Sequence, residues 1–157
     1  MEMNIGISER NREKVAIALS KLLADEYLLY TKTKEAHWNV EGIDFYDKHR
    51  LFDEQAGQLS DISDSVAERI RTLGHPVPAT LKAFLELTHL TENSLQISNS
   101  RTFISELLTA HEIIIVFLRE NINLFANEYE DLGTSDFVTS LMQEHEKMAW
   151  ILRAHLK

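Results

Sequence analysis

Among the side chains of residues 36–69 are five whose types and spacing suit an iron site. Two are imidazoles, His37 and His49, and three are carboxylates, Asp53, Asp64 and Glu68. Imidazole nitrogen and carboxylate oxygen are donors that suit iron. Because a negatively charged ligand set favours Fe³⁺ over Fe²⁺, such a site also promotes oxidation of the ion that it binds. The five residues therefore predict an iron-binding site.

Four of these residues fall on one predicted helix. From residue 44 to about residue 71 nothing breaks a helix except one tolerated glycine. His49 with Asp53, and Asp64 with Glu68, are pairs spaced four residues apart, so each pair presents two ligands side by side. The pairs begin fifteen residues apart, which is roughly 22 Å along a helix. Metal–ligand bonds are about 2 Å long, so one copy of this helix cannot close one site with both pairs.

The two pairs share one side of the helix, and the apolar side chains occupy the opposite side. The apolar set, which should face the core, is Phe45, Phe52, Ala56, Leu59, Ile62, Val66, Ile70 and Leu73. An antiparallel copy of the helix, related by a two-fold axis between residues 58 and 59, would set His49 against the partner's Glu68 and Asp53 against the partner's Asp64. Gly57 would then face Ser60 of the partner subunit, so that only small side chains lie where the two helices cross. We therefore predict two equivalent intersubunit sites per dimer; the alternative is a solvated, charged helix face.

The fifth ligand lies at the end of the preceding predicted helix. Ser8 can cap a helix that runs to about Trp38, roughly 45 Å long. Residues 39–42 form the turn, and Asp44 can cap the next helix. An antiparallel hairpin of the two helices would bring His37 close to His49, which completes a half-site of His37, His49 and Asp53 within one subunit.

This stretch resembles the signature of the Dps family, the miniferritins. The signature has an HW pair after the first helix, followed by H-x3-D and D-x3-E on the second helix. All five ligand positions match the family's ferroxidase centre in type and spacing. The similarity continues through LGHPVPATL and reaches the late HEKMAWILR, so that it covers most of the chain.

The resemblance implies a ferroxidase and iron store in the form of a twelve-subunit hollow shell. Fe²⁺ would be oxidised at the dimer interface, with hydrogen peroxide as the preferred oxidant, and kept inside as ferric mineral. One or two irons per centre are both open, and other divalent metals such as Zn²⁺ can substitute. Trp38 matches a tryptophan that supplies an electron when peroxide is reduced; its alternative role is to fill the core. Asp131 and Asp136 match pore-lining positions, and their alternative role is solubilising loop charge.

Length and composition predict one all-α domain, 1–157, and the resemblance implies that it is a ferritin-like four-helix bundle. The chain has 157 residues, five glycines, two prolines and no cysteine, which favours long helices without disulfides or thiolate metal sites. No secretory signal or membrane-spanning run is recognisable, so we expect a cytoplasmic protein with no membrane partner. The expected order after residue 78 is a short helix at about 79–90, a loop at 91–100, a third helix from Ser100, a break at Gly133–Ser135 and a fourth helix.

Three more histidines could in principle bind a metal ion, but the residues around them do not favour this. His111 and His145 lie within apolar stripes and have no carboxylate three or four residues away on their face, so we expect hydrogen-bonded core histidines and no metal inside the bundle. Glu86 and His89 have the spacing used by intra-bundle di-iron proteins. Those proteins need two such pairs on core helices, and we treat this single pair as a coincidence.

DNA binding is the point at which the chain departs from the family pattern. Members that condense DNA usually carry a lysine-rich terminal extension. Here Arg10, Arg12 and Lys14 are cancelled by the three glutamates of residues 1–14, and the net charge is −9. Such a charge should repel phosphate. We therefore do not expect strong DNA binding, and a non-enzymatic protein that shields DNA is the alternative function.

Overall fold

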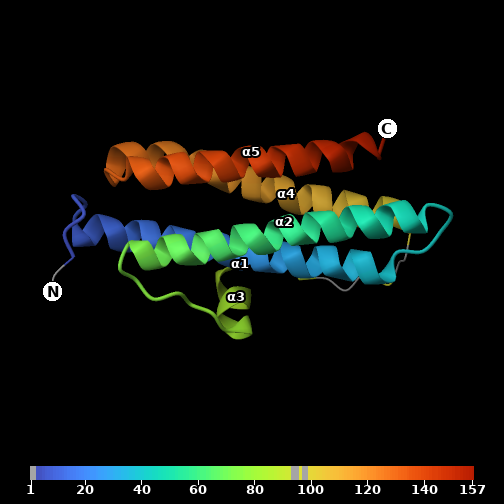
Figure 1. Cartoon of the computed structure of the whole chain (residues 1–157), viewed down its shortest axis with the longest axis horizontal. Coiled ribbons are helices and arrows are strands. Elements are labelled where there is room, and N and C mark those ends of the chain that lie inside the picture. The colour runs from blue at the N-terminus through green and yellow to red at the C-terminus, as the bar shows by residue number, and fades with distance from the viewer. Residues whose placement is uncertain (1–2, 93–95, 97–98) are drawn as a thin grey trace.

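Four long helices lie side by side along one axis in the computed structural model, which describes residues 3–92, 96 and 99–157 (Figure 1). The helices are α1 (Glu9–Asn39), α2 (Phe45–Thr72), α4 (Ser100–Asn123) and α5 (Leu132–Ala154). A short helix, α3 (Leu81–Leu87), stands outside the bundle beside α1. This is the predicted four-helix bundle with an extra short helix in the second connection.

The first two helices begin near the predicted residues, but only the first has the predicted cap. Ser8 accepts a hydrogen bond at its Oγ from the backbone N–H of Asn11 at 3.2 Å, which caps α1 as predicted. Asp44 occupies the cap position of α2 without capping it. Its carboxylate instead accepts a hydrogen bond from Ser100 Oγ at 2.7 Å, and this bond lowers the pKa of Asp44. The start of α2 is thereby tied to the start of α4.

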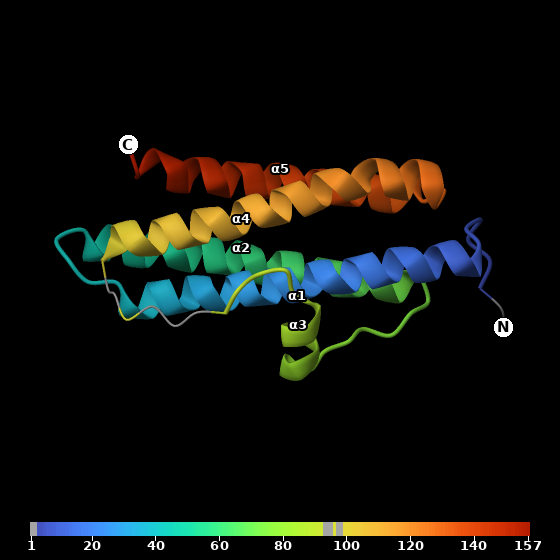
Figure 2. The same cartoon turned by 180° about the vertical axis from the view of Figure 1, so that it is seen from behind.

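The connection between α2 and α4 crosses the whole bundle, so these two helices run in the same direction (Figure 2). A buried carboxylate on α1, Asp25, holds the connection in place. It accepts hydrogen bonds from Thr88 Oγ1 and the His89 backbone N–H, both at 2.6 Å, and contacts His89 Nδ1 at 2.7 Å. The predicted helix at 79–90 is shorter than expected, and residues 93–95 and 97–98 of the predicted loop lie outside the described residues.

The predicted break between the last two helices at Gly133–Ser135 is wrong. The helical path of α4 continues as a π-helix, Leu124–Glu128, and α5 already begins at Leu132. Asp131 caps α5 by accepting a hydrogen bond from the Thr134 backbone N–H at 2.8 Å. Gly133 therefore lies in the first turn of a capped helix. The chain reverses at Glu130, whose φ is +55°.

The core follows the predicted helical periodicity. On α2 every predicted core residue except the exposed Phe45 is buried, and on α5 residues at three- and four-residue spacing form a buried stripe: Val138, Leu141, His145, Met148 and Leu152. The carboxylates Asp53, Asp64 and Glu68 are exposed on the other side of α2. No helix in the described part of the chain is long and apolar enough to cross a membrane. The bundle thus buries its own core and leaves the ligand-bearing side of α2 uncovered.

Candidate metal centre

The turn between α1 and α2 brings His37 and His49 together. His37 lies in the last turn of α1 and His49 in the second turn of α2. Gly42, with φ of +131°, makes the reversal possible because this backbone conformation is strained for residues with a side chain. The two imidazole rings stack with centroids 3.8 Å apart and an interplanar angle of 17°. This confirms that the hairpin places the two histidines side by side.

Each of these histidines orients the ring of the other. His37 Nδ1 lies 2.7 Å from the carbonyl oxygen of His49, and His49 Nδ1 lies 2.8 Å from the carbonyl oxygen of His37. A carbonyl oxygen only accepts hydrogen bonds, so both Nδ1 atoms carry the proton. In the neutral ring the lone pair is then on Nε2, which is free to bind a metal ion. Backbone carbonyls commonly fix metal-binding histidines in this way.

Asp53 adds a carboxylate one turn after His49. Its Oδ1 lies 3.7 Å from His37 Nε2, a spacing that a metal ion with bonds of about 2 Å to each atom can bridge. The Lys34 ammonium donates a hydrogen bond to the same oxygen at 3.0 Å. This hydrogen bond and the positive charge of Lys34 lower the pKa of Asp53, so the carboxylate is ionised at neutral pH. The chemistry of the three donors fits Fe²⁺.

One subunit does not complete this site. Among residues 3–92, 96 and 99–157 no three His, Cys, Asp or Glu side chains converge closely enough to hold a metal ion. Asp64 and Glu68 lie exposed near the far end of α2 and are not brought to the half-site by this chain. A Cβ atom added to Gly57, midway between the two ligand pairs, would meet nothing within 4 Å beyond its own helical turn, so the helix surface there is open. All three residues are thus exposed on the surface of the single subunit.

Trp38 follows His37 and is exposed rather than buried. Its relative exposure is 68%, which excludes the alternative that it fills the core of its own subunit. The Lys34 ammonium lies 5.4 Å from the centroid of the Trp38 ring, a cation–π distance. One lysine thus contacts both Asp53 and Trp38.

The two predicted pore residues have different surroundings. Asp131 is 1% exposed, and besides capping α5 it accepts hydrogen bonds from Thr134 Oγ1 at 2.5 Å and from Arg69 Nη2 at 3.2 Å. Its carboxylate joins the end of α2 to the start of α5. Asp136 is exposed one turn further along. The pore prediction, which concerns assembled subunits, therefore rests mainly on Asp136.

The bundle interior contains three polar side chains in contact with one another, of which sequence analysis identified only two. His111 and His145 are fully buried, as predicted, and their Nδ1 atoms are 2.9 Å apart. Sequence spacing missed the carboxylate: His145 Nε2 lies 2.8 Å from Oε1 of Glu26, which is buried on α1. Burial, followed by the charge of His145, holds the pKa of His111 well below its usual range. These groups bond to one another, as core histidines do, and lie apart from the half-site.

Comparison with known proteins supports the same interpretation of the fold. The family model of the ferritin-like domain matches residues 17–157. DNA protection during starvation protein 2 of Bacillus anthracis is 31% identical to this chain, over 92% of the chain and 97% of the relative.

Two solved structures superpose over the whole chain. DpsC from Streptomyces coelicolor has a TM-score of 0.95 at 30% identity and is covered over 91% of its length. The Dps protein of Vibrio cholerae, described as a member of the ferritin-like diiron-carboxylate superfamily, has a TM-score of 0.92 at 31% identity and is covered over 98% of its length. With a family match over most of its length and full-length similarity to these proteins, the chain belongs to the Dps family of ferritin-like proteins.

Proposed function

We propose that the protein is a ferroxidase and iron store that protects against peroxide. The observation that carries this proposal is the half-site, in which two stacked histidines with free Nε2 atoms stand next to an ionised aspartate. Membership of a family within the diiron-carboxylate superfamily supports iron as the ion that these residues bind. Iron is here the substrate, and the stored product is a ferric mineral.

The complete centre forms between two subunits. His37, His49 and Asp53 bind Fe²⁺ from one side, and Asp64 and Glu68 of the partner subunit bind it from the other. The exposure of the ligand side of α2 supports this arrangement, because the open surface at Gly57 lets an antiparallel copy approach closely and the metal ion offsets the charge of the facing carboxylates. Two equivalent centres per dimer follow from the two-fold symmetry. We further propose that six such dimers form a twelve-subunit hollow shell.

Hydrogen peroxide is the proposed oxidant. Its reduction to two water molecules takes up two electrons and two protons, and each Fe²⁺ that becomes Fe³⁺ supplies one electron. Trp38, adjacent to His37 along the chain and exposed beside Lys34, is the proposed source of an electron when only one Fe²⁺ is at hand. Consuming peroxide together with Fe²⁺ in this way suppresses hydroxyl-radical formation. Asp136 is the proposed contributor to the pores through which Fe²⁺ enters, with Asp131 as a residue that shapes the same turn.

The test is Fe²⁺ oxidation after rapid mixing with hydrogen peroxide. The double variant His37→Gly with His49→Gly removes both nitrogen donors, and we expect its oxidation rate to fall by about tenfold or more. His111→Gln is the matched control because that histidine lies apart from the half-site. An oxidation rate unchanged in the double variant would refute the proposed centre.

A second candidate function is physical protection of DNA. The similarity to the DNA protection during starvation protein 2 of Bacillus anthracis favours this function. The net charge of −9 opposes it, since binding to phosphate at physiological salt requires a cationic surface. Divalent metal ions that bridge acidic side chains to DNA could supply some binding. We therefore rank DNA shielding second.

A further inference from the structure

A groove with a lysine at each end runs between α1 and the last part of α4, and it contains no residue of the half-site. Its volume is about 280 Å³. Two lysines and otherwise uncharged side chains line it: Lys14, Ile17, Ala18, Lys21, Phe117, Asn121, Leu124 and Tyr129. In the described part of the chain no carboxylate is among the lining residues, although acidic residues outnumber basic ones by 25 to 16. The groove is therefore a locally cationic site on an acidic subunit.

The two lysines lie at opposite ends of the groove. The Lys14 ammonium is 5.2 Å from the centroid of the Tyr129 ring, which places it where the π-helix ends. Lys21 lies two helical turns further along α1, which corresponds to about 10 Å. Because α1 and α4 run in opposite directions, Lys21 is at the Phe117 end of the groove (Figure 2). With Ile17 between the lysines on α1, the groove has a positive charge at each end and an apolar middle.

Neither lysine is neutralised by a neighbour. Within residues 3–92, 96 and 99–157 no carboxylate forms an ion pair with Lys14 or Lys21. Both side chains are half-buried, whereas the ammonium group of a lysine without a partner normally extends into water. Ile17 between them is 52% exposed. The two charges and the apolar surface that separates them thus lack a partner within the subunit.

We infer that this groove binds an elongated organic dianion, a dicarboxylate with an apolar chain between its two carboxylates. Each carboxylate accepts hydrogen bonds from one lysine, and the chain lies against Ile17, Phe117 and Leu124. A carboxylate carries one negative charge and so matches the single ammonium at each end, whereas a phosphate monoester carries up to two. This binding is independent of the proposed iron chemistry, because the groove shares no residue with the half-site.

The alternative is that the lysine stems only cover apolar surface while their ammonium groups remain hydrated. Anions would then be attracted weakly by either lysine, without regard to the distance between two carboxylates. The two explanations differ in whether a ligand with two carboxylates binds better than one of the same length with a single carboxylate.

The experiment is titration of the assembled, metal-free protein at low ionic strength, followed by saturation-transfer difference NMR of the ligand. Three probes share an eight-carbon chain: suberate has a carboxylate at each end, octanoate has one, and 1,8-octanediol has none. We expect suberate to bind at least about threefold more tightly than octanoate, because one ion pair is lost. The uncharged diol should bind most weakly. This comparison changes the ligand alone and leaves the protein intact.

Substitution of the lysines should have the same effect as removal of a carboxylate from the ligand. Lys14→Met and Lys21→Met should each lower the affinity for suberate to about that of octanoate for the wild-type protein. The variant with both substitutions should bind suberate no better than it binds the diol. Circular dichroism checks that the variants remain folded.

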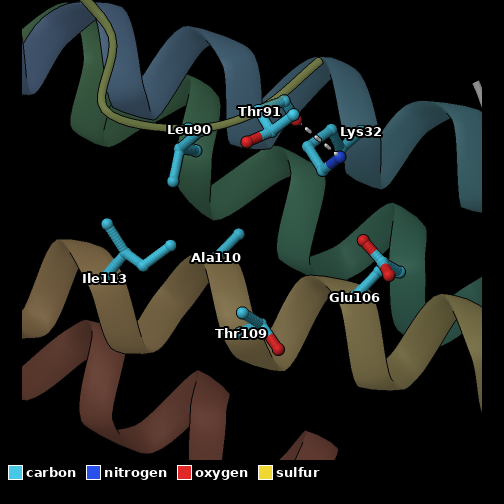
Figure 3. A pocket seen from close by; sticks show the side chains of 7 residues that line it. All are labelled: Lys32, Leu90, Thr91, Glu106, Thr109, Ala110 and Ile113. Atoms are coloured by element: carbon cyan, nitrogen blue, oxygen red, sulfur yellow. Dashed lines mark hydrogen bonds between the residues drawn. The ribbon is translucent and has the colours of Figure 1, made fainter. Parts of the chain in front are cut away.

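Lys32 offers a matched control on the same helix. Figure 3 shows it at a smaller pocket of about 150 Å³, which contains Glu106 of α4 and therefore both signs of charge. The Lys32 ammonium already donates a hydrogen bond to the Thr91 carbonyl oxygen at 3.2 Å. Lys32→Met removes the same charge from α1 and should leave the affinity for suberate unchanged.

Three results would overturn the inference. The first is that suberate binds the wild-type protein no more tightly than octanoate. The second is an unchanged affinity for suberate in either Lys14→Met or Lys21→Met. The third is that Lys32→Met weakens binding as much as these two variants do. Iron oxidation is not measured in any of these titrations, so their outcome leaves the proposed ferroxidase activity to its own test.

Discussion

At the scale of single residues, Trp38 has the most specific proposed role. A centre that holds one Fe²⁺ delivers one electron, but reduction of peroxide to water needs two. The second electron must come from a neighbouring group, and Trp38 is next to a ligand and close to Lys34. The oxidised indole is then reduced by the next Fe²⁺ that enters, so that the electrons balance over two ions and one peroxide.

Trp38→Phe should therefore abolish a transient tryptophan radical. We expect electron paramagnetic resonance of the freeze-quenched wild-type protein, mixed with Fe²⁺ and peroxide, to show this radical within the first turnover. Trp150→Phe is the control, since Trp150 is the other tryptophan in the chain and is similarly exposed on α5. An unchanged radical in Trp38→Phe, or its loss in Trp150→Phe, would show that the electron has another source.

Contacts between single residues could be predicted from the sequence only where the residues lie close together along the chain. The ligands of the half-site follow from fixed offsets along one helix and from one short turn. The contact between Lys34 and Asp53 joins residues on two helices, and neither periodicity nor a motif distinguishes Lys34 from a solvated lysine. The carboxylate partner of His145 is even more distant, because Glu26 lies 119 residues earlier. Such contacts are set by the packing of helices, which local patterns do not encode.

At the scale of helices, α2 depends on Gly57 for pairing but not for its own fold. Gly57 has a helical conformation and an open surface, so a larger side chain meets nothing within the subunit. Replacement by Ala or Leu should even stabilise the helix by about 0.5–1 kcal/mol. Across the proposed two-fold axis the same side chain would push the two helices apart.

We expect Gly57→Leu to fold normally but to lose dimers and Fe²⁺ oxidation together. Gly57→Ala should show a smaller effect of the same kind. Circular dichroism and urea unfolding report on the subunit, and light scattering reports on the assembly. Should Gly57→Leu assemble fully and oxidise Fe²⁺ at the wild-type rate, the antiparallel pairing of α2 through this residue is wrong.

The buried histidines should make the bundle sensitive to acid. The pKa of His111 is lowered in the folded protein, so below about pH 6.5 the unfolded chain takes up a proton that the folded chain does not. Stability contributed by neutral His111 is therefore full above this pH and is lost as the pH falls. Between pH 7.5 and 5.5 the loss is about 1 kcal/mol for one proton.

Urea unfolding at pH 7.5 and 5.5 tests this expectation. The wild-type protein should lose more unfolding free energy between the two values than His111→Gln, whose side chain does not titrate. His89→Gln is the control for a histidine that is partly exposed. An equal loss in the wild-type protein and in His111→Gln would place the acid sensitivity elsewhere.

The long helices were predicted best from the sequence, and the boundary between α4 and α5 was predicted worst. Apolar residues at three- and four-residue spacing indicate the buried stripes of α1, α2 and α5 directly. The glycine of the segment DLGTSD suggested a break, but Asp131 supplies the cap that lets α5 begin before Gly133. A glycine within the first helical turn disrupts little. The actual reversal occurs at Glu130, a residue type that gives no local turn signal.

At the scale of the whole molecule, net charge separates the two candidate functions. A subunit with a net charge of −9 is expected to repel DNA, and the proposed assembly of such subunits is expected to repel it more strongly. We expect no mobility shift of plasmid DNA at neutral pH and about 0.15 M salt without divalent metal ions. Retardation of the plasmid under these conditions would place DNA protection ahead of iron oxidation.

The central claim is that each centre is built from two subunits, and complementation between variants tests it most directly. One variant carries His37→Gly with His49→Gly, and the other carries Asp64→Asn with Glu68→Gln. Alone, each variant breaks every centre. In a mixed dimer, one centre combines the intact histidines of one subunit with the intact carboxylates of the other, and the second centre lacks both sets.

The measurement is the rate of Fe²⁺ oxidation by peroxide after co-expression of the two variants in equal amounts. Half of randomly formed dimers are mixed, and each of these has one intact centre of two, so we predict recovery of about a quarter of the wild-type rate. Either variant expressed alone should stay inactive. No recovery in co-assembled protein would contradict the intersubunit centre.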